Sequence, residues 1–495
     1  MCNLRNCSLI IDKKFIGGKI MKKLLAIMLA SAMVLSLAAC GGSAPAADAA
    51  APAAAEEAAP AADGSAAPAS DSGKTVINVM AFTDEVPNML KRYCELNPDF
   101  GSKYEIKETI IATTDGLYQP ALDAALAAGG AEAPDIYAAE AAFILKYSQG
   151  DAAGFAASYE DLGIDVASAT KEADIAQYTI DIGTRPADGK LVGLGYQSTG
   201  GAFIYRRSIA KEVFGTDDPK EIAKVIGAGS GNWDKFFEAA ETLKSKGYAI
   251  ISGDGDMWHA VENSSPTGWI VDGKLNIDPA REEFLDLSKK LMDNGYHHDT
   301  RDWEEGWFAD MKKDGGVFGF YGPAWLINYT IAPNSGEGDE SSAGDWAACE
   351  PNIGFFWGGT WVLANKDVVG SEKQEAVKEL INWVTLDCTE NGLQYYWANG
   401  TLNGEGGTKD DVASGTVLSM SNGEMEFLGG QNMFDVFVPA NAYANGKNLT
   451  QYDETINTYW RDAVRQYTSG ALDRDGAIEA FKTNVADNLD VEVDF

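Results

Sequence analysis

Residues 75–111, "TVINVMAFTDEVPNMLKRYCELNPDFGSKYEIKETII", decide the fold class, because they contain the patterns of a strand, a helix and a second strand. The short apolar run at 75–82 predicts a buried strand, and residues 103–111 predict another. Residues 86–98 between them predict a helix that stops at a proline. The buried face of this helix is expected to carry Met89, Leu90, Tyr93 and Leu96.

The alternation continues beyond this stretch, with a helix predicted at 118–130 and a short strand at 133–140. Strands that alternate with helices indicate βαβ units, so we expect an α/β fold with mostly parallel strands. Residues 371–387 predict a later helix that begins with a capping box and buries Val377, Leu380, Ile381 and Val384. Residues 451–470 again show the pattern of an amphipathic helix.

Length and charge limit the classes of partner. The chain has 495 residues, enough for two large domains, and its 39 basic and 74 acidic side chains give a net charge of −35. Because affinity for phosphate groups comes from Lys and Arg, this balance argues against nucleic acid as a partner. The three histidines, His259, His297 and His298, lack a metal-binding spacing, although His259 is placed to touch a ligand. We expect a monomer without cofactor or metal.

The six cysteines do not form a disulfide framework. Two lie near the N-terminus, and Cys40 has a separate role described below. Cys94, Cys349 and Cys388 remain, an odd number without metal-type spacing. A Cys349–Cys388 disulfide and two separate buried thiols are both open, and the tendency of free cysteine to be buried favours the thiols.

Residues 21–40, "MKKLLAIMLASAMVLSLAAC", have the order of a signal peptide: two lysines, an apolar run and small residues. The ending before Cys40 resembles the bacterial lipobox, which implies cleavage after residue 39 and a lipid on Cys40. An uncleaved anchor helix is the alternative. Residues 1–20 fit no signal peptide, and Gly17-Gly18-Lys19 can be encoded by a purine-rich ribosome-binding sequence. We therefore expect translation to start at Met21.

Residues 40–74 contain almost only small, acidic and proline residues after the cysteine, and they have no bulky apolar side chains to bury. Such a composition predicts a disordered tether between a lipid anchor and a folded body that begins near Thr75. The expected location is therefore the extracytoplasmic face of the cell membrane.

Five segments support a family resemblance, and they occur in a fixed order behind the lipobox. They are "LDAALAAGGAEAPDIY" (122–137), "GGAFIYRRSIAKEVFG" (200–215), "FGFYGPAW" (318–325), "GFFWGGTWVLANK" (354–366) and "FLGGQNMFDVF" (427–437). Together they resemble the family 1 extracellular solute-binding lipoproteins of ABC transporters, the class of maltose-binding and multiple-sugar-binding proteins. The resemblance covers nearly all of residues 75–495.

The resemblance implies a two-lobed, periplasmic-binding-protein-like fold, a Venus flytrap with a hinge and with lobes that are discontinuous in sequence. Mapped onto this chain, lobe 1 comprises 75–199 and 355–412, and lobe 2 comprises 200–354 and 413–495. The crossings would follow "GYQSTGG" (195–201) and lie near "PNIGFFWGG" (351–359).

Carboxylates follow two of the predicted strands. In open α/β sheets ligands bind beyond the carboxyl ends of the strands, which selects Asp84, Glu85 and Glu140. An ionised carboxylate accepts strong hydrogen bonds from vicinal hydroxyl groups. Capping of the helices that follow is the alternative role for each of the three.

The tryptophans supply candidate stacking surfaces for an apolar sugar face. Trp258 follows a polar glycine loop, and Trp325 follows the Gly-Pro turn after which the family commonly places a ligand-stacking aromatic residue. Trp357 lies in the aromatic stretch "NIGFFWGGTW" (352–361) at the expected return crossing. Trp303 and Trp307, four residues apart, indicate one helix face.

Three further residues complete the predicted ligand-binding set: Tyr196 and Gln197 near the first crossing, and Gln431 in "GGQN". The expected function is capture of a carbohydrate, in particular an oligosaccharide, and its presentation to the permease subunits of an ABC importer, without catalysis. Two alternatives stay open. The acidity and the aromatic residues also suit a cationic or other non-sugar solute. A glycoside hydrolase needs only two suitably spaced carboxylates.

Overall fold

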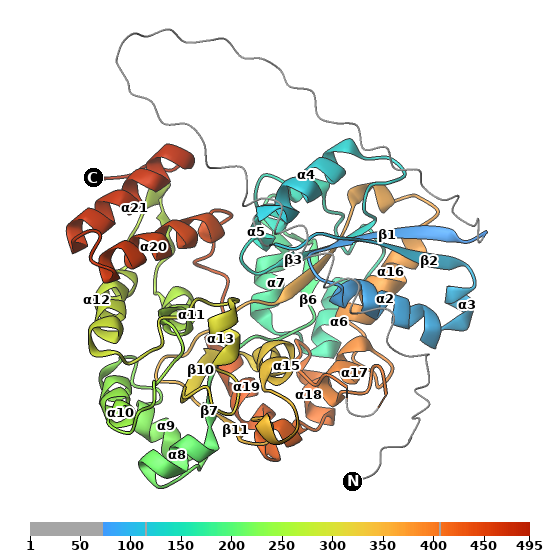
Figure 1. Cartoon of the computed structure of the whole chain (residues 1–495). Helices are drawn as coiled ribbons and strands as arrows, with labels where there is room; N and C mark the ends of the chain where they lie inside the picture. The colour runs from blue at the N-terminus through green and yellow to red at the C-terminus, as the bar shows by residue number, and fades with distance from the viewer. Residues whose placement is uncertain (1–72, 114–115, 405–406) are drawn as a thin grey trace, which may run out of the picture. The chain divides into compact units, whose positions relative to one another are not determined.

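Two separate β-sheets, each accompanied by its own helices, organise the chain in the computed structural model (Figure 1). The structure describes residues 73–113, 116–404 and 407–495. The expected N-terminal extension, signal peptide and lipidated Cys40, with the tether up to residue 72, lie outside the described residues. We call the part built on the larger sheet lobe 1 and the part built on the smaller sheet lobe 2.

Lobe 1 contains a five-stranded sheet with the strand order β2-β1-β3-β12-β6. Its strands are β1 (Thr75–Ala81), β2 (Tyr104–Ile110), β3 (Ile136–Glu140), β6 (Gly193–Gly195) and β12 (Thr360–Ala364). The first three are parallel, as the alternating pattern predicts. β12 is antiparallel to both of its neighbours, because it enters the sheet from lobe 2 in the opposite direction.

The helices of lobe 1 come from the N-terminal segment and from the segment after β12 (Figure 1). They are α2 (Glu85–Leu96), α3 (Pro98–Gly101), α4 (Tyr118–Ala128), α5 (Ile144–Ser148), α6 (Val166–Ala173), α7 (Gln177–Gly183), α16 (Gln374–Thr385), α17 (Leu393–Asn399) and α18 (Gly415–Met420). A small hairpin joins β4 (Thr184–Arg185) to β5 (Lys190–Leu191). α18 contacts α6 and α17, so the chain is still packed on lobe 1 at residue 420.

Lobe 2 contains a three-stranded antiparallel sheet of β10 (Gly319–Gly322), β7 (Ala202–Arg206) and β11 (Trp346–Cys349), in that order. Its longer helices are α8 (Arg207–Phe214), α9 (Pro219–Ile226), α10 (Asp234–Lys244), α11 (Asp254–Ser264), α12 (Pro279–Asn294), α20 (Asp453–Thr468) and α21 (Arg474–Asn488). Its shorter elements are β8 (Ile270–Val271), β9 (Lys274–Leu275), α13 (Glu305–Ala309), α14 (Ala324–Leu326), α15 (Ala332–Asn334), β13 (Glu424–Met425), β14 (Gln431–Asn432) and α19 (Phe434–Ala440).

The chain passes between the sheets in segments that pair with one another. It leaves lobe 1 between β6 and β7 and returns between β11 and β12. The two crossings meet where Gly200 and Phe356 form an isolated bridge and where the Trp357 backbone N–H donates to Thr199 O at 3.1 Å. A third segment joins them, because Gln197 forms a bridge with Val412. The two crossings therefore pair with each other, and the segment at Val412 pairs with the first of them before the chain continues into α18 of lobe 1.

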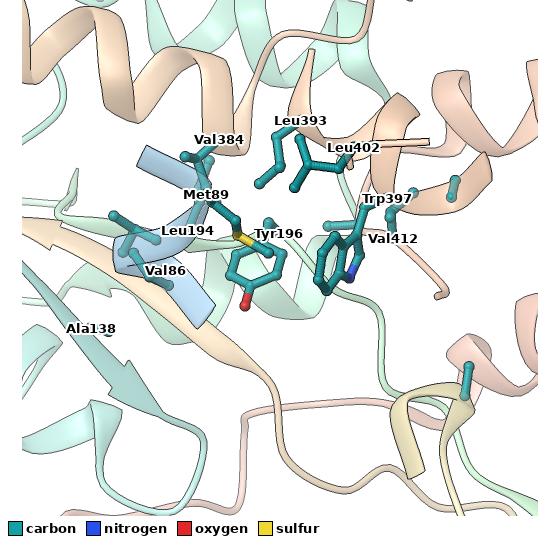
Figure 2. Close-up of a cluster of buried hydrophobic side chains, with 14 of the residues drawn as sticks. Val86, Met89, Ala138, Leu194, Tyr196, Val384, Leu393, Trp397, Leu402 and Val412 are labelled. Atoms are coloured by element: carbon teal, nitrogen blue, oxygen red, sulfur yellow. The ribbon is translucent and has the colours of Figure 1, made fainter. Parts of the chain in front are cut away.

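The core of lobe 1 confirms the predicted helix faces. Met89, Leu90 and Tyr93 of α2 are buried and Leu96 is partly buried, while the four apolar residues predicted for α16 are all buried. The capping box predicted for this helix is wrong, because α16 begins at Gln374 and has no side-chain cap. Figure 2 shows side chains of α2, β3, β6, α16 and α17 packed together around the ring of Tyr196, with Trp397 beside it. This packing brings Tyr196, which directly follows β6, into the core next to the first crossing.

The described cysteines, Cys94, Cys349 and Cys388, are free thiols, so the alternative of a Cys349–Cys388 disulfide is wrong. Cys349 ends β11 in lobe 2, and Cys388 follows α16 in lobe 1. In the described part of the chain, no helix is long and apolar enough to cross a membrane.

Candidate functional site

A cavity of about 490 Å³ lies between the lobes. Lobe 1 contributes Glu140 at the end of β3, and the return crossing contributes residues 356–358. Lobe 2 contributes side chains of α11, of the 301–304 loop and of α20. The cavity therefore lies beyond the carboxyl end of a strand and beside the hinge segments, where a ligand touches both lobes at once.

Gly358, which lines this cavity, lies between the side chains of Glu140, which also lines it, and Trp325. Gly358 has φ +73°, and a Cβ atom built on it would lie 3.3 Å from both Glu140 Oε1 and Trp325 Cζ2. Glycine is therefore needed both for the backbone conformation and for the close approach. The carbonyl of Gly358 also accepts a hydrogen bond from Thr199 Oγ1 at 3.0 Å, which ties the two crossings together.

The Glu140 carboxyl group is held in an environment that favours its neutral form. Burial raises the pKa of Glu140 to about 8, although the backbone N–H of Ala142 donates to Oε2 at 2.7 Å and opposes the rise. Repulsion by Glu454 and Glu262 acts in the same direction as burial. At neutral pH this carboxyl group can therefore donate as well as accept a hydrogen bond.

Four aromatic side chains, Trp303, Trp325, Tyr329 and Trp357, form a surface that we call the aromatic platform. The rings of Trp303 and Trp325 are nearly parallel, with an interplanar angle of 10° and centroids 6.2 Å apart. Trp325 Nε1 donates to the Trp357 carbonyl at 3.0 Å. Trp303 and Tyr329 remain 46% and 53% exposed. Tyr329 lies in a π-helical segment, Ile327–Ile331, a distortion that often marks functional sites.

Trp303 adopts a backbone conformation that bulky residues avoid. Its φ is +68°, which strains a residue with a Cβ and a large ring. The preceding residue anchors the loop, because Arg461 Nη1 donates to Asp302 Oδ2 at 2.7 Å. Burial alone would raise the pKa of Asp302, but the charge of Arg461 holds it well below its usual range. The buried ion pair thus maintains the strained backbone, and this backbone holds the exposed indole of Trp303 within the platform.

His259 on α11 stacks on the ring of Trp357, with centroids 3.5 Å apart and an interplanar angle of 13°. Its Nε2 lies 3.3 Å from Asp302 Oδ2, but neither ring nitrogen has a hydrogen-bond partner in the described structure. Burial lowers the pKa of His259, so the neutral ring prevails at pH 7. A buried polar group without a partner costs free energy, and a ligand can supply the missing bond.

Comparison with known proteins assigns this chain to a family. A family model described as bacterial extracellular solute-binding protein matches residues 95–401, well over half of the chain. The chain belongs to the bacterial extracellular solute-binding proteins. No curated protein matches the sequence at a significant level.

Solved structures share the fold of this solute-binding protein at low sequence identity. An extracellular solute-binding protein of family 1 has a TM-score of 0.65 at 17% identity, covering 83% of this chain and 99% of its own. The galacto-N-biose/lacto-N-biose I-binding protein of the Bifidobacterium longum ABC transporter has a TM-score of 0.63 at 18% identity, covering 85% and 99%.

A third solved structure is the GacH receptor of Streptomyces glaucescens, with a TM-score of 0.59 at 15% identity, covering 84% of this chain and 99% of its own. The expected two-lobed α/β fold is thereby confirmed.

The solute-binding protein has a second polar cluster on the lobe 1 side of the hinge. The Tyr196 hydroxyl donates to Glu85 Oε1, and Gln197 Nε2 donates to Asp410 Oδ2 at 2.8 Å. Burial raises the pKa of Glu85 and of Asp410. Glu85, Tyr196 and Gln197 therefore bond within lobe 1, and they do not line the cavity above Glu140.

The other predicted residues occupy varied positions. Trp258 is 1% exposed and packs on Phe284 at 4.9 Å, although it also lines the cavity. Asp84 precedes α2, makes no side-chain cap and accepts from Asn88 Nδ2 at 3.1 Å. Gln431 bonds to the backbone N–H and carbonyl of Ala348. It borders a separate cavity of about 950 Å³ formed by α9, α19 and the segment between β11 and the return crossing.

Sequence patterns did not bring Trp303 into the predicted site. The expectation that Trp303 and Trp307 share one helix face is wrong, because α13 begins at Glu305. Trp307 is buried, whereas Trp303 turns outward with positive φ. Asp302 and Arg461, 159 residues apart, likewise carry no local signal. The signal that identifies this loop is structural: an exposed aromatic residue with positive φ, which the sequence does not show.

Proposed function

We propose that this protein is the substrate-binding component of an ABC importer and captures a carbohydrate, in particular an oligosaccharide, in the cavity between its lobes. The observation that carries the proposal is that two rings of the aromatic platform, Trp303 and Trp357, line the same cavity as the carboxyl groups. A sugar has an apolar face that stacks on indole rings and a rim of hydroxyl groups that carboxylates can bind.

The dimensions and the relatives support this class of ligand. A volume of about 490 Å³ falls in the range of small-molecule sites. Two of the structurally similar proteins are described in complex with lacto-N-biose and with acarbose, respectively. Trp303 in the cavity wall and Tyr329 in ring contact with it are both exposed, so more than one ring is available to stack on successive sugar units, which favours an oligosaccharide.

The proposed mechanism is closure of the lobes on the solute. The crossings at 196–201 and 355–359 act as the hinge, and Glu140 from lobe 1 meets Trp303 and His259 from lobe 2 across the ligand. A ligand that contacts both lobes favours the closed form over the open form, since it gains contacts only on closure. The closed form is then presented to the permease, and partner ATPase subunits supply the energy of transport. A lipid on Cys40 would hold the protein at the extracytoplasmic face of the membrane.

Titration calorimetry with a panel of neutral sugars, oligosaccharides and small cations, at two salt concentrations, tests the proposal. We expect a carbohydrate to bind with little salt dependence, since uncharged ligands are not screened. Trp325→Ala should weaken that binding at least tenfold, whereas Trp383→Ala, a core change in lobe 1, should leave it unchanged in folded protein. Failure of every carbohydrate to bind contradicts the proposal, and cleavage of a bound oligosaccharide would identify a hydrolase.

A further inference from the structure

Four carboxyl groups line the cavity without an ion-pair partner in the described structure. They belong to Glu140 at the end of β3, Glu262 on α11, and Asp453 and Glu454 on α20. Their hydrogen bonds come from neutral donors. Glu262 accepts from Asn457 Nδ2, Glu454 from Gln119 Nε2 and Asp453 from Thr450 Oγ1. Side chains from both lobes thus gather acidic groups around one space.

The neighbouring basic side chains are engaged elsewhere or do not pair with these groups. Arg461 pairs with Asp302 and Asp254, and Arg465 pairs with Asp462. Arg281 lies near Glu262 and Asp453 but stacks over Trp269 and donates to the Thr267 carbonyl. Arg301 is exposed at the cavity edge without an ion pair within the described residues. The cavity is therefore lined by more carboxyl groups than basic side chains, and the four carboxyl groups form no ion pair within the described residues, although Arg281, Arg461 and Lys146 act on three of them from a distance.

A second, independent observation at the same cavity points to a ligand. His259, 7% exposed, faces the cavity with two ring nitrogens that no described group bonds. Asp302 Oδ1 beside it is also buried and unpartnered. A neutral imidazole offers one acceptor and one donor, so a ligand with both hydroxyl and amine groups can complete its bonds.

We propose that the solute is a saccharide that carries a primary ammonium group, an amino sugar, and that this ammonium lies among Glu140, Glu262, Asp453 and Glu454 while a sugar face stacks on the aromatic platform. The inference rests on the proposed function. The ammonium donates three hydrogen bonds to acceptors that the protein leaves without a cation, and bonds between charged groups are the strong ones.

The inference predicts proton release on binding. Burial raises the pKa of Glu140 to about 8 and that of Glu262 to about 7, so the empty cavity retains protons in place of a cation. An ammonium favours the ionised carboxylates and expels these protons. The other charged or titratable groups that line the cavity are His259, Arg301, Asp302, Glu304, Asp453, Glu454, Arg461 and Arg465, and Arg281 and Lys146 act on the same carboxyl groups from outside the lining. Affinity for the ammonium should therefore increase from pH 5 to pH 7.

Matched sugar sets test the charge directly. Mono- to tetrasaccharides of glucosamine, N-acetylglucosamine and glucose differ at one substituent, and calorimetry compares them with spermidine at pH 5 and pH 7. We expect the free amine to bind about ten- to a hundredfold more tightly than the hydroxyl or acetylated form at pH 7, the range for one charge-assisted hydrogen bond. Heats measured in buffers of different ionisation enthalpy should show proton release for the amine alone.

Each other outcome overturns a defined part of the proposal. Equal or tighter binding of the neutral oligomers overturns the ammonium site and leaves the proposed function intact. Spermidine binding without saccharide binding overturns the proposed function while the carboxyl cluster stands as a cation site. No binding by any saccharide or by spermidine overturns both.

A pair of charge-neutralising variants separates the cavity from the general acidity of the protein. Glu262→Gln removes one of the four carboxyl groups, and Glu283→Gln removes an exposed one from α12 of the same lobe. Glu262→Gln should reduce the preference for the amine over the hydroxyl form about tenfold, whereas Glu283→Gln should leave it unchanged. The same preference in both variants would overturn the assignment.

Discussion

Replacing Gly358 by alanine tests whether the cavity wall at this glycine sets ligand affinity. Gly358 has φ +73°, and forcing alanine into this region costs about 1–2 kcal/mol. The new Cβ would lie 3.3 Å from Glu140 Oε1 and from Trp325 Cζ2. That spacing is tight but short of a severe clash, so the two side chains shift by a few tenths of an ångström. The shift falls on Glu140, which lines the cavity, and on Trp325, which packs against the cavity-lining ring of Trp357.

Gly370→Ala is the matched control. Gly370 has φ +80°, and no heavy atom lies within 4 Å of the position that a Cβ would take, so the variant carries the same backbone strain in open space. Both variants should lose about 1–2 kcal/mol of unfolding free energy in urea titrations. Only Gly358→Ala should also weaken binding of the best saccharide, by about tenfold, or about 1.4 kcal/mol, in tryptophan fluorescence titrations. Equal affinity of the two variants would refute the role given to this contact.

Three further changes probe the strained loop, the hinge and the buried acid. Trp303→Gly should be about 1–2 kcal/mol more stable than Trp303→Ala, because both lose the ring but only glycine relieves the positive φ, and both should lower saccharide affinity; equal stability of the two variants contradicts the strain argument. Tyr196→Phe removes the hydroxyl that bonds to Glu85 and should cost about 1–3 kcal/mol in urea unfolding, with no cost if the bond is dispensable. The pKa of Glu140, about 8 in the folded state, lies above its unfolded value of 4.5, so its stabilising contribution is complete below pH 4.5 and is lost as pH rises to 8. Glu140→Gln should therefore become more stable relative to wild type between pH 5 and pH 8, and a constant difference would contradict the raised pKa.

Local patterns predicted the parts of the fold that depend on local physics. The apolar stripes of α2 and α16 follow directly from residue spacing, because helical periodicity places those side chains on one face. The antiparallel insertion of β12 was not predicted, since nothing local shows which strands it joins. Strand pairing across such distances in sequence is a property of the whole chain.

The site was predicted less completely, for the same physical reason. Glu140, Trp258, Trp325 and Trp357 line or flank the cavity region that strand ends and aromatic motifs select. The place of Trp303 in the site depends on its positive φ, which the sequence does not show. That conformation is held by the ion pair between the neighbouring Asp302 and Arg461 of α20. The carboxyl cluster likewise comes from three elements that only the tertiary fold brings together, so no residue spacing in the sequence predicts it.

The position of β12 in the sheet of lobe 1 has a consequence for the order of folding. β12 lies between β3 and β6, yet Thr360 comes 220 residues after Glu140 in the chain. The sheet of lobe 2 is complete once residue 349 has been made, whereas in lobe 1 β6 has no strand partner and β3 has only one until β12, which ends at residue 364, has been made. Unpaired edges invite aggregation, and contacts so distant in sequence form slowly. The sheet of lobe 1 begins first but is completed after the sheet of lobe 2, so in a nascent chain the strand that joins β3 to β6 follows a second sheet whose strands are already made.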